Sequence, residues 1–550
     1  MASVKSIRIS YPLLLLAAAL LLLWALYPIR NHSESDDAYM FASNIRDLTP
    51  ANLVENPAHR LYHVFSQCLW KLCGRPDVVV FLTVTSVIYG LVATLMVGLI
   101  AKQRWGFSTA TSLITALFCA AIYNVWRYSH EVETYSLAWA SSLFAMWLAL
   151  GPRGKVAGGI IGGISTGFHL MNAVMIGPAI ALALWIRDGF RPAVVYGLAV
   201  WAGLAVMFGL PWAITKVMPE KASPAWMIEG SLIPWEETQT DDVKLEWNLQ
   251  GVPLHKTAVR ETFALGATIL ASNWLFYDDA ISRRLSELFP EKNITEEIAL
   301  GVRMPDFLFW LSAVTFVLAV MAFLWICGGI LARRAENGKW SLPYALRFMA
   351  DWRMVLVLVW LGSYFAVQVK IGAAAPESWT PVVPAIALIF GLGLSCFSPA
   401  RQTMYGVCAL VLIFCHNFIG GIAPLRHKEW DLNFQQNQWL IENATANDVV
   451  IGCNFLSVDR YLNWYSPAKT IQLSQCAKPD HMTRLMNVAR DYTKTSGGRI
   501  LVRHEVLHPP AYLGVLGRPD FSAVPQSWKD NGMLRQVVGG DFPIYEYVSP

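Results

Sequence analysis

Long apolar segments dominate this chain and leave few folds open to it. The first runs from Tyr11 to Pro28, carries no charge and is long enough to cross a bilayer as a helix. Of the 550 residues, 55% are hydrophobic and only 15% are charged. The composition therefore predicts a polytopic α-helical membrane protein. Its hydropathy indicates about eleven spans, at Tyr11–Pro28 and at about 78–101, 107–123, 137–150, 156–170, 172–186, 193–213, 307–331, 353–371, 382–398 and 403–423.

The basic residues predict which way the spans run, because short cytoplasmic loops are usually rich in Lys and Arg. If Lys5 and Arg8 are cytoplasmic, every second loop is cytoplasmic and each of these loops is basic: 102–104, 153–155, 187–191, 333–339 and the turn at Arg401. This count requires two short spans within 156–186, broken near residues 169–172. One merged helix would invert every later loop.

The first apolar run is predicted to be an uncleaved anchor and not a signal peptide. It is longer than the usual signal-peptide core and ends in Trp24-Ala25-Leu26-Tyr27-Pro28, without a small-x-small cleavage site. A transmembrane module would then occupy residues 1–423. Its exterior loops would be 29–77, 124–136, 214–306 and 372–381.

The composition changes near residue 424, after which a soluble exterior α/β domain is expected at 424–550. Strand-like segments at 448–453, 499–503 and 543–548 accompany a helical pattern at 481–492. Cys453 and Cys476 both fall in this domain, so a disulfide between them is an open alternative if the compartment is oxidising.

The first exterior loop holds an acidic pair, Asp36 and Asp37, directly after the first span. Residues 38–48 and 58–73 then show apolar side chains at helical spacing, which is typical of helices lying along a membrane surface. The polar face of the second helix would carry His59, Arg60, His63 and Lys71. Carboxylates just outside a hydrocarbon core are well placed for chemistry on a lipid headgroup.

Other classes of protein fit less well. A net charge of +4 spread over short loops does not indicate a nucleic-acid partner. A membrane transporter should carry ionisable residues at mid-membrane depth, whereas these spans are nearly free of charge. A non-catalytic envelope assembly or binding protein stays open as the second alternative.

Several segments resemble the GT-C glycosyltransferases, in particular the protein O-mannosyltransferase and aminoarabinose transferase branch. Ser35-Asp36-Asp37-Ala38-Tyr39 is similar to the Asp-Glu-Ala-Tyr signature of that superfamily, with Asp37 in place of Glu. Residues 56–63 resemble its Asn-Pro-His-Pro-Leu-Tyr segment, and 127–137 its Ala-Glu-Val-Tyr-Ser-Leu segment, with Glu133 on the family acid. Weaker likenesses lie at 163–169 and at 377–384, where Glu377 replaces a common basic residue.

The resemblance implies sugar transfer from a polyprenyl-phosphate donor to an acceptor outside the membrane. Such transfer needs a base that deprotonates the acceptor, and Asp36 is the predicted general base with Asp37 as its supporting acid. Neighbouring carboxylates raise one another's proton affinity toward the working pH. Glu133 is the third predicted catalytic residue. A salt bridge from Arg127 to Glu131 or Glu133 is the structural alternative.

The departing phosphate needs hydrogen-bond donors and positive charge. Several alternatives compete with these roles: Lys370 near a span end could snorkel, His59 and His63 could form the polar face of a surface helix, and His169 could mark a helix break. The predicted binding residues for the donor phosphate or substrate are His59, Arg60, Arg127, His130, Lys370 and Glu377.

No obligatory metal is predicted, because the resemblance is closer to the monophosphate-dependent branches. A divalent cation held by Asp36, Asp37 and Glu133 is the alternative. The sequence identifies neither the sugar nor the acceptor, which could be a glycan, a lipid or a protein. A bacterial inner membrane with a periplasmic active site is the expected location, and an endoplasmic reticulum membrane is the alternative.

Overall fold

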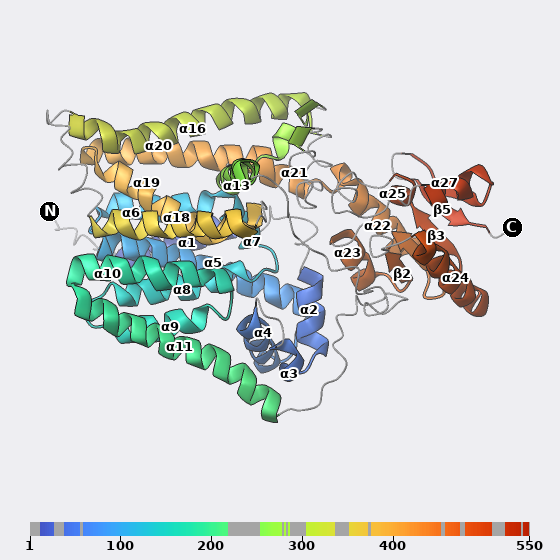
Figure 1. The fold of residues 1–550 in the computed structure, drawn as a ribbon. Helices are drawn as coiled ribbons and strands as arrows, with labels where there is room; N and C mark the ends of the chain where they lie inside the picture. The colour runs from blue at the N-terminus through green and yellow to red at the C-terminus, as the bar shows by residue number, and fades with distance from the viewer. Residues whose placement is uncertain are drawn as a thin grey trace, which may run out of the picture.

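The computed structural model describes residues 11–26, 38–54, 59–217, 254–277, 280–281, 284–285, 304–335, 351–371, 376–452, 457–472, 479–508, 523–540 and 543–548. The acidic pair Asp36 and Asp37 lies outside these residues, as do Cys453 and Cys476. Figure 1 shows a bundle of roughly parallel helices, with a small domain of strands and helices beyond one end of it.

The predicted spans are confirmed as helices. Seven helical runs in the described part of the chain are long and apolar enough to cross a membrane, and α6 and α9 are shorter apolar helices. The helices at the predicted spans are α1 (Tyr11–Leu26), α5 (Val78–Leu99), α6 (Thr109–Ala121), α8 (Tyr135–Ala149), α9 (Lys155–Ser165), α10 (Ile180–Asp188), α11 (Phe190–Val217), α16 (Asp306–Ala335), α18 (Trp352–Ile371), α19 (Val383–Ser395) and α20 (Pro399–Asn417).

Short helical turns extend several of these helices. They are the π-helical turns η2 (Ile100–Arg104), η4 (Met175–Ala179) and η7 (Phe418–Ile422), the 3-10 turns η3 (Leu170–Asn172), η5 (Asn273–Tyr277) and η6 (Pro376–Val382), and α21 (Ala423–Arg426). The predicted break within 156–186 is confirmed. The helix α9 ends at Ser165, and the next helical run starts at Leu170.

The predicted cytoplasmic loops at 102–104, 153–155 and 187–191 meet at one end of the bundle, which we call the basic end. Arg104 Nε donates to the Trp147 carbonyl at 2.9 Å, and Arg187 Nη1 donates to the Leu150 carbonyl at 3.0 Å. Arg353 Nη1 reaches the Trp105 carbonyl at 3.3 Å. These bonds satisfy the last carbonyls of neighbouring helices. They bring the ends of η2, α8 and α10 and the start of α18 to one side, while the side of the membrane stays a prediction.

Glycines let α9 and α11 approach closely. A Cβ added at Gly163 would lie 2.4 Å from the Val200 carbonyl oxygen, and one added at Gly203 would lie 2.2 Å from that of Ile160. Helix association in a bilayer relies on close van der Waals contact, because lipid tails are as apolar as the side chains. The glycine-rich run 158–163 therefore allows this helix pair to pack backbone against backbone.

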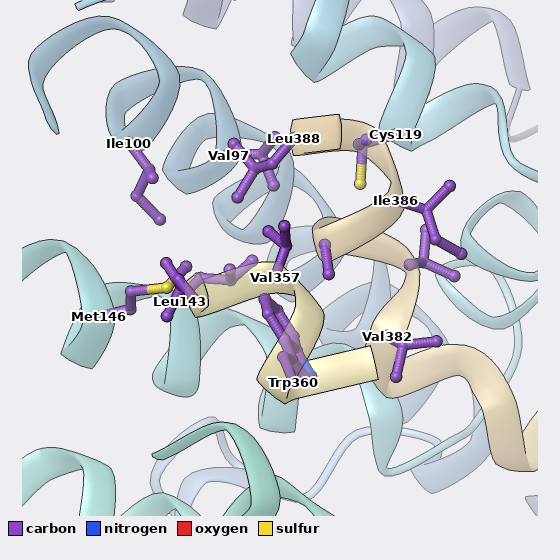
Figure 2. Close-up of a cluster of buried hydrophobic side chains, with 14 of the residues drawn as sticks. Val97, Ile100, Cys119, Leu143, Met146, Val357, Trp360, Val382, Ile386 and Leu388 are labelled. Carbon is purple, nitrogen blue, oxygen red and sulfur yellow. The ribbon is translucent and has the colours of Figure 1, made fainter. Parts of the chain in front are cut away.

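The centre of the bundle is filled by interlocking apolar side chains (Figure 2). Val97 and Ile100, Cys119, Leu143 and Met146, Val357 and Trp360, and Ile386 and Leu388 come from five different segments of the chain. Trp360 is only 2% exposed. This core fixes α18 and α19. It therefore also fixes the η6 turn, which directly precedes α19 at the end of the bundle opposite the basic end.

The first exterior loop forms the predicted surface helices at that opposite end (Figure 1). They are α2 (Ala38–Asp47), the short α3 (Pro50–Leu53) and α4 (Arg60–Leu72). Gln67 in α4 donates to the carbonyls of Ile45 and Leu48, both at 2.8 Å, and so joins α4 to the end of α2. One expectation is corrected: His63 does not lie on a solvated polar face but is 1% exposed, because α4 packs against α2 on that side.

Two further helices belong to this end of the bundle and were not recognised in the sequence. They are α7 (Tyr123–Tyr128) in the second exterior loop and α13 (Leu254–Ile269) in the long third loop.

The tail contains the expected α/β domain. Its helices are η8 (Lys428–Trp430), α22 (Leu432–Asn443), α23 (Ser457–Tyr465), α24 (Pro479–Ser496), α25 (His504–Leu507) and α27 (Ala523–Asp530). The strands are β1 (Val449–Gly452), β2 (Lys469–Gln472), β3 (Ile500–Arg503), β4 (Leu534–Val538) and β5 (Ile544–Tyr547), in the order β2-β1-β3-β5-β4.

Side-chain alternation along the central strands explains how the helices cover this sheet. Strands β2, β1 and β3 are parallel, while β5 and β4 are antiparallel additions. Ile451 and Val502 pack with α24 on one face, and Val450 and Leu501 pack with α22 and α23 on the other. Successive residues of a strand point to opposite faces, so these continuous apolar strands are covered on both sides. The boundary at residue 424 stays a prediction.

Candidate active site

The second exterior loop places two acids in the interior of the protein. Glu131 and Glu133 follow α7 and are only 1% and 6% exposed. Arg127 Nε lies 3.3 Å from Glu131 Oε1, so the predicted alternative of a salt bridge holds for Glu131. Glu133 Oε2 accepts from the Thr134 amide at 3.3 Å. A buried carboxylate is costly without partners. The guanidinium of Arg127 and the amide of Thr134 supply partners for these two acids.

Glu377 reaches the same region from the η6 turn. Two side chains hold the start of this turn, because Asn124 Nδ2 and Thr268 Oγ1 both donate to the Pro376 carbonyl at 2.7 Å. The phenol of Tyr128 then donates to Glu377 Oε2 at 3.4 Å. The second exterior loop and the late 3-10 turn, which are far apart in sequence, are therefore joined at one carboxylate.

Aromatic and imidazole rings continue from Tyr128 toward the first loop. Tyr128 lies 5.5 Å from Tyr135 between ring centroids, Tyr135 lies 5.1 Å from His169, and His169 lies 5.2 Å from His59. The predicted first and second exterior loops, the break after α9 and the η6 turn thus converge. We call the resulting set the polar cluster: His59, Tyr128, Glu133, Tyr135, His169 and Glu377.

Burial keeps the Tyr128 phenol and the His169 imidazole neutral. It raises the pKa of the Tyr128 phenol well above its usual range, while Arg127 opposes the rise and Glu377 adds to it. Burial also lowers the pKa of His169 to about 3, with a further contribution from His59. His169 Nδ1 accepts from the Met171 amide at 3.3 Å, so its proton sits on Nε2 at neutral pH.

This arrangement suits a ligand with both anionic oxygens and hydroxyl groups. The neutral imidazole of His169 can donate from Nε2 to a phosphate oxygen, and Glu133 and Glu377 can accept from hydroxyl groups. Arg127 places a positive charge beside the cluster. Its guanidinium lies 5.2 Å from the centre of the Tyr128 ring, and its side chain is 12% exposed. The polar cluster therefore combines the groups that a phosphate-linked sugar would require.

The structure brings some predicted residues to the cluster and leaves others beside it. Glu133, His59, Glu377 and Arg127 lie in or next to it. His130 is 2% exposed, and its Nδ1 pairs with the Trp126 carbonyl at 2.7 Å, so its ring holds the end of α7.

Two predicted cations lie outside the cluster. The Arg60 guanidinium lies 5.6 Å from the Phe208 ring of α11. Lys370 is exposed in the last turn of α18, as expected of a snorkelling lysine.

Several residues of this site were not assigned from the sequence. Tyr128 and Tyr135 were seen only as part of a similar segment. Glu261 was missed because α13 was not recognised as a helix, yet it is 0% exposed and accepts at 2.8 Å from Nε1 of Trp379, which follows Glu377 by two residues in η6. A charged pair, Arg260-Glu261, in the middle of an apolar helical pattern is the signal that could have revealed it.

A metal centre has no support from the residues that the structure describes. No group of three or more His, Cys, Asp or Glu side chains in the described ranges is arranged to hold a metal ion. Two of the three carboxylates proposed for the alternative cation site, Asp36 and Asp37, lie outside those ranges.

The arrangement of bundle, surface helices and tail domain is shared with solved structures of low sequence identity, so the comparison supports the predicted resemblance at the level of the fold alone. The solved structures that the chain is similar to include ArnT from Cupriavidus metallidurans, bound to undecaprenyl phosphate and in the apo state. Each comparison covers 98% of both chains, with TM-scores of 0.51 and 0.50 and 11% identity. No protein-family model matches the chain, and no curated protein matches its sequence.

Proposed function

We propose that this protein is a membrane glycosyltransferase that moves a sugar from a polyprenyl-phosphate donor to an acceptor at the end of the bundle opposite the basic loops. The observation that carries the proposal is a fold likeness over 98% of both chains to ArnT, which was solved with undecaprenyl phosphate bound. The polar cluster supports it independently, because its neutral donors and buried carboxylates match the chemistry of a phosphate-linked sugar.

In the proposed reaction Asp36 removes a proton from an acceptor hydroxyl. The acceptor oxygen then attacks the anomeric carbon of the sugar, the bond from that carbon to the phosphate oxygen breaks, and the polyprenyl phosphate leaves as an anion. Asp37 supports Asp36, and Glu133 is the third catalytic acid of the proposal. Arg127 stabilises the leaving phosphate, while the phenol of Tyr128 holds the Glu377 carboxylate, which orients hydroxyl groups of the sugar.

The transferred group would be a hexose or a pentose, and the acceptor a glycan, lipid or protein. Mannosyltransferase-like activity and a bacterial inner membrane location, with the tail domain in the periplasm, follow from the sequence resemblance. The fold and the apolar helices support integral membrane placement.

The decisive experiment incubates the purified full-length protein with labelled polyprenyl-phosphate sugars and membrane fractions, and records which component gains label. Asp36→Asn should reduce kcat by roughly 10²- to 10⁴-fold, as expected for loss of a general base, and Asp37→Asn should reduce it less. Asp491→Asn, at an exposed carboxylate of α24, is the matched control and should transfer normally.

Each arm of this experiment has a result that counts against the proposal. Wild-type rates in Asp36→Asn would remove Asp36 as the base. A wild-type protein that transfers no sugar from any donor of the panel would refute the glycosyltransferase assignment. Parallel assays in EDTA decide between the metal-independent reaction and the divalent cation alternative.

A further inference from the structure

The tail domain contacts the first exterior loop through a group of aromatic side chains on α23. Tyr39, in the first turn of α2, is 5% exposed. Its ring lies 5.6 Å from Tyr461, 5.9 Å from Trp464 and 5.9 Å from Tyr465 between centroids. We call Tyr461, Trp464 and Tyr465 the aromatic clamp. The clamp encloses one side chain of the loop that carries the acidic pair.

A second contact extends the clamp along α2. The Arg46 guanidinium lies 4.5 Å from the centre of the Trp464 ring. Tyr39 and Arg46 are seven residues apart, which places them two turns apart on one face of a helix. Trp464 therefore contacts both the beginning and the end of α2, and the helix cannot rotate about its axis without breaking one of these contacts.

The clamp is itself held by the tail domain. Gln438 Nε2 of α22 donates to the Tyr461 hydroxyl at 2.7 Å, and the Phe434 ring of the same helix lies 5.4 Å from the Tyr461 ring. Helix α22 packs on the sheet through Leu440, which is fully buried with Val450. A continuous path of contacts thus leads from the sheet to Tyr39.

The opposite side of α2 faces α4. Phe41 contacts the rings of His63 at 5.0 Å and His59 at 6.0 Å. Helix α2 is consequently packed between the tail domain on one side and the imidazole side chains of His59 and His63 on the other. Ala38, its first residue, is fully buried and is joined directly to Asp37.

We propose that the aromatic clamp is a positioning device for the acidic pair, acting through Tyr39. Asp37 precedes Tyr39 by only two residues in the sequence. Fixing Tyr39 therefore limits where the chain enters α2. The inference rests on the proposed function for its catalytic part, and it assigns the tail domain a role in setting the geometry of the base. A misplacement of about 1 Å at a reacting group lowers rates by about 10²-fold.

The test uses the full-length protein in lipid nanodiscs. Trp464→Ala should lower kcat by about 10- to 100-fold, leave the KM for the polyprenyl-phosphate donor unchanged, and speed amide exchange across α2. Trp464→Phe keeps an aromatic ring at the same position and should restore most of kcat. Trp528→Ala removes an indole from α27, where it packs in the core on the α24 face of the sheet, and should change neither kcat nor exchange in α2.

A second variant covers the case in which Trp464→Ala fails to fold. Tyr465 is 49% exposed, so Tyr465→Ala removes a clamp ring without opening the interior, and it should also speed exchange in α2 and lower kcat. Unchanged exchange in α2, a normal kcat despite faster exchange, or an equal loss in Trp528→Ala would each overturn the inference. Exchange does not depend on catalysis. A wild-type protein without transferase activity therefore refutes the proposed function, while exchange in α2 still decides whether the clamp holds that helix.

Discussion

Acidification should loosen the first exterior loop, because His63 is buried as a neutral ring. The side chain is 1% exposed, it packs against Phe41 and Tyr62, and neither ring nitrogen has a hydrogen-bond partner among the described residues. Burial lowers the pKa of His63 to about 3, and the neighbouring His59 lowers it further. The unfolded chain, with a histidine pKa of about 6.5, binds a proton at a pH where the folded chain does not.

The sign follows from proton linkage. A histidine with a lowered pKa in the folded state contributes its full stability above about pH 6.5, and that contribution is lost as the pH falls toward about 3. At pH 5 the difference for His63 is about 2 kcal/mol, from about 1.5 pH units at 1.36 kcal/mol each. Openings of α4 that release His63 should therefore become about 30-fold more frequent than at pH 7.5.

Hydrogen exchange of the α4 amides at pH 5 and pH 7.5, divided by the intrinsic rates, measures this change. His63→Phe retains the ring volume and should lose the 30-fold factor. His255→Phe, at an exposed position of α13, should behave like the wild type. If wild type and His63→Phe lose protection equally on acidification, the buried neutral state of His63 is wrong and the reasoning fails with it.

Two further predictions concern packing. Glu261→Ala leaves the buried Trp379 indole without its acceptor and should cost about 1–3 kcal/mol of stability, whereas Glu261→Gln keeps an acceptor oxygen; equal melting temperatures for the two variants would contradict this. Gly203→Ala places a Cβ 2.2 Å from the Ile160 carbonyl oxygen and should destabilise by about 1–3 kcal/mol. Gly209→Ala in the same helix meets open space and should not, so similar thermal unfolding of both variants would exclude close packing at Gly203.

Much of the fold followed from local patterns in the sequence. Apolar runs and basic loops predicted the spans and their alternation, including the break between α9 and η3. Strand and helix patterns in the tail predicted β1, β3, β5 and α24. The elements that were missed, such as α13, α23 and β4, are short or carry mixed polarity, so their local signal is weak and their burial depends on partners far along the chain.

The site was only partly predictable for a related reason. Glu133 and Glu377 were chosen from similar segments, but the link between their loops through Tyr128 depends on a contact across 249 residues of sequence. His63 was expected on a solvated face, because helical spacing shows which residues share a face and not what that face meets. Only the packing of α4 against α2 decides that.

The sequence by itself determined that the chain spans a membrane, since no other environment accommodates such a succession of apolar segments. The basic residues also predicted that the loops at 102–104, 153–155 and 187–191 share a side. The tertiary structure alone decided which side chains of those loops meet, because helix-to-helix contacts in a bilayer depend on the shape of the packed surfaces and not on hydropathy. The polar cluster and the aromatic clamp are products of that packing.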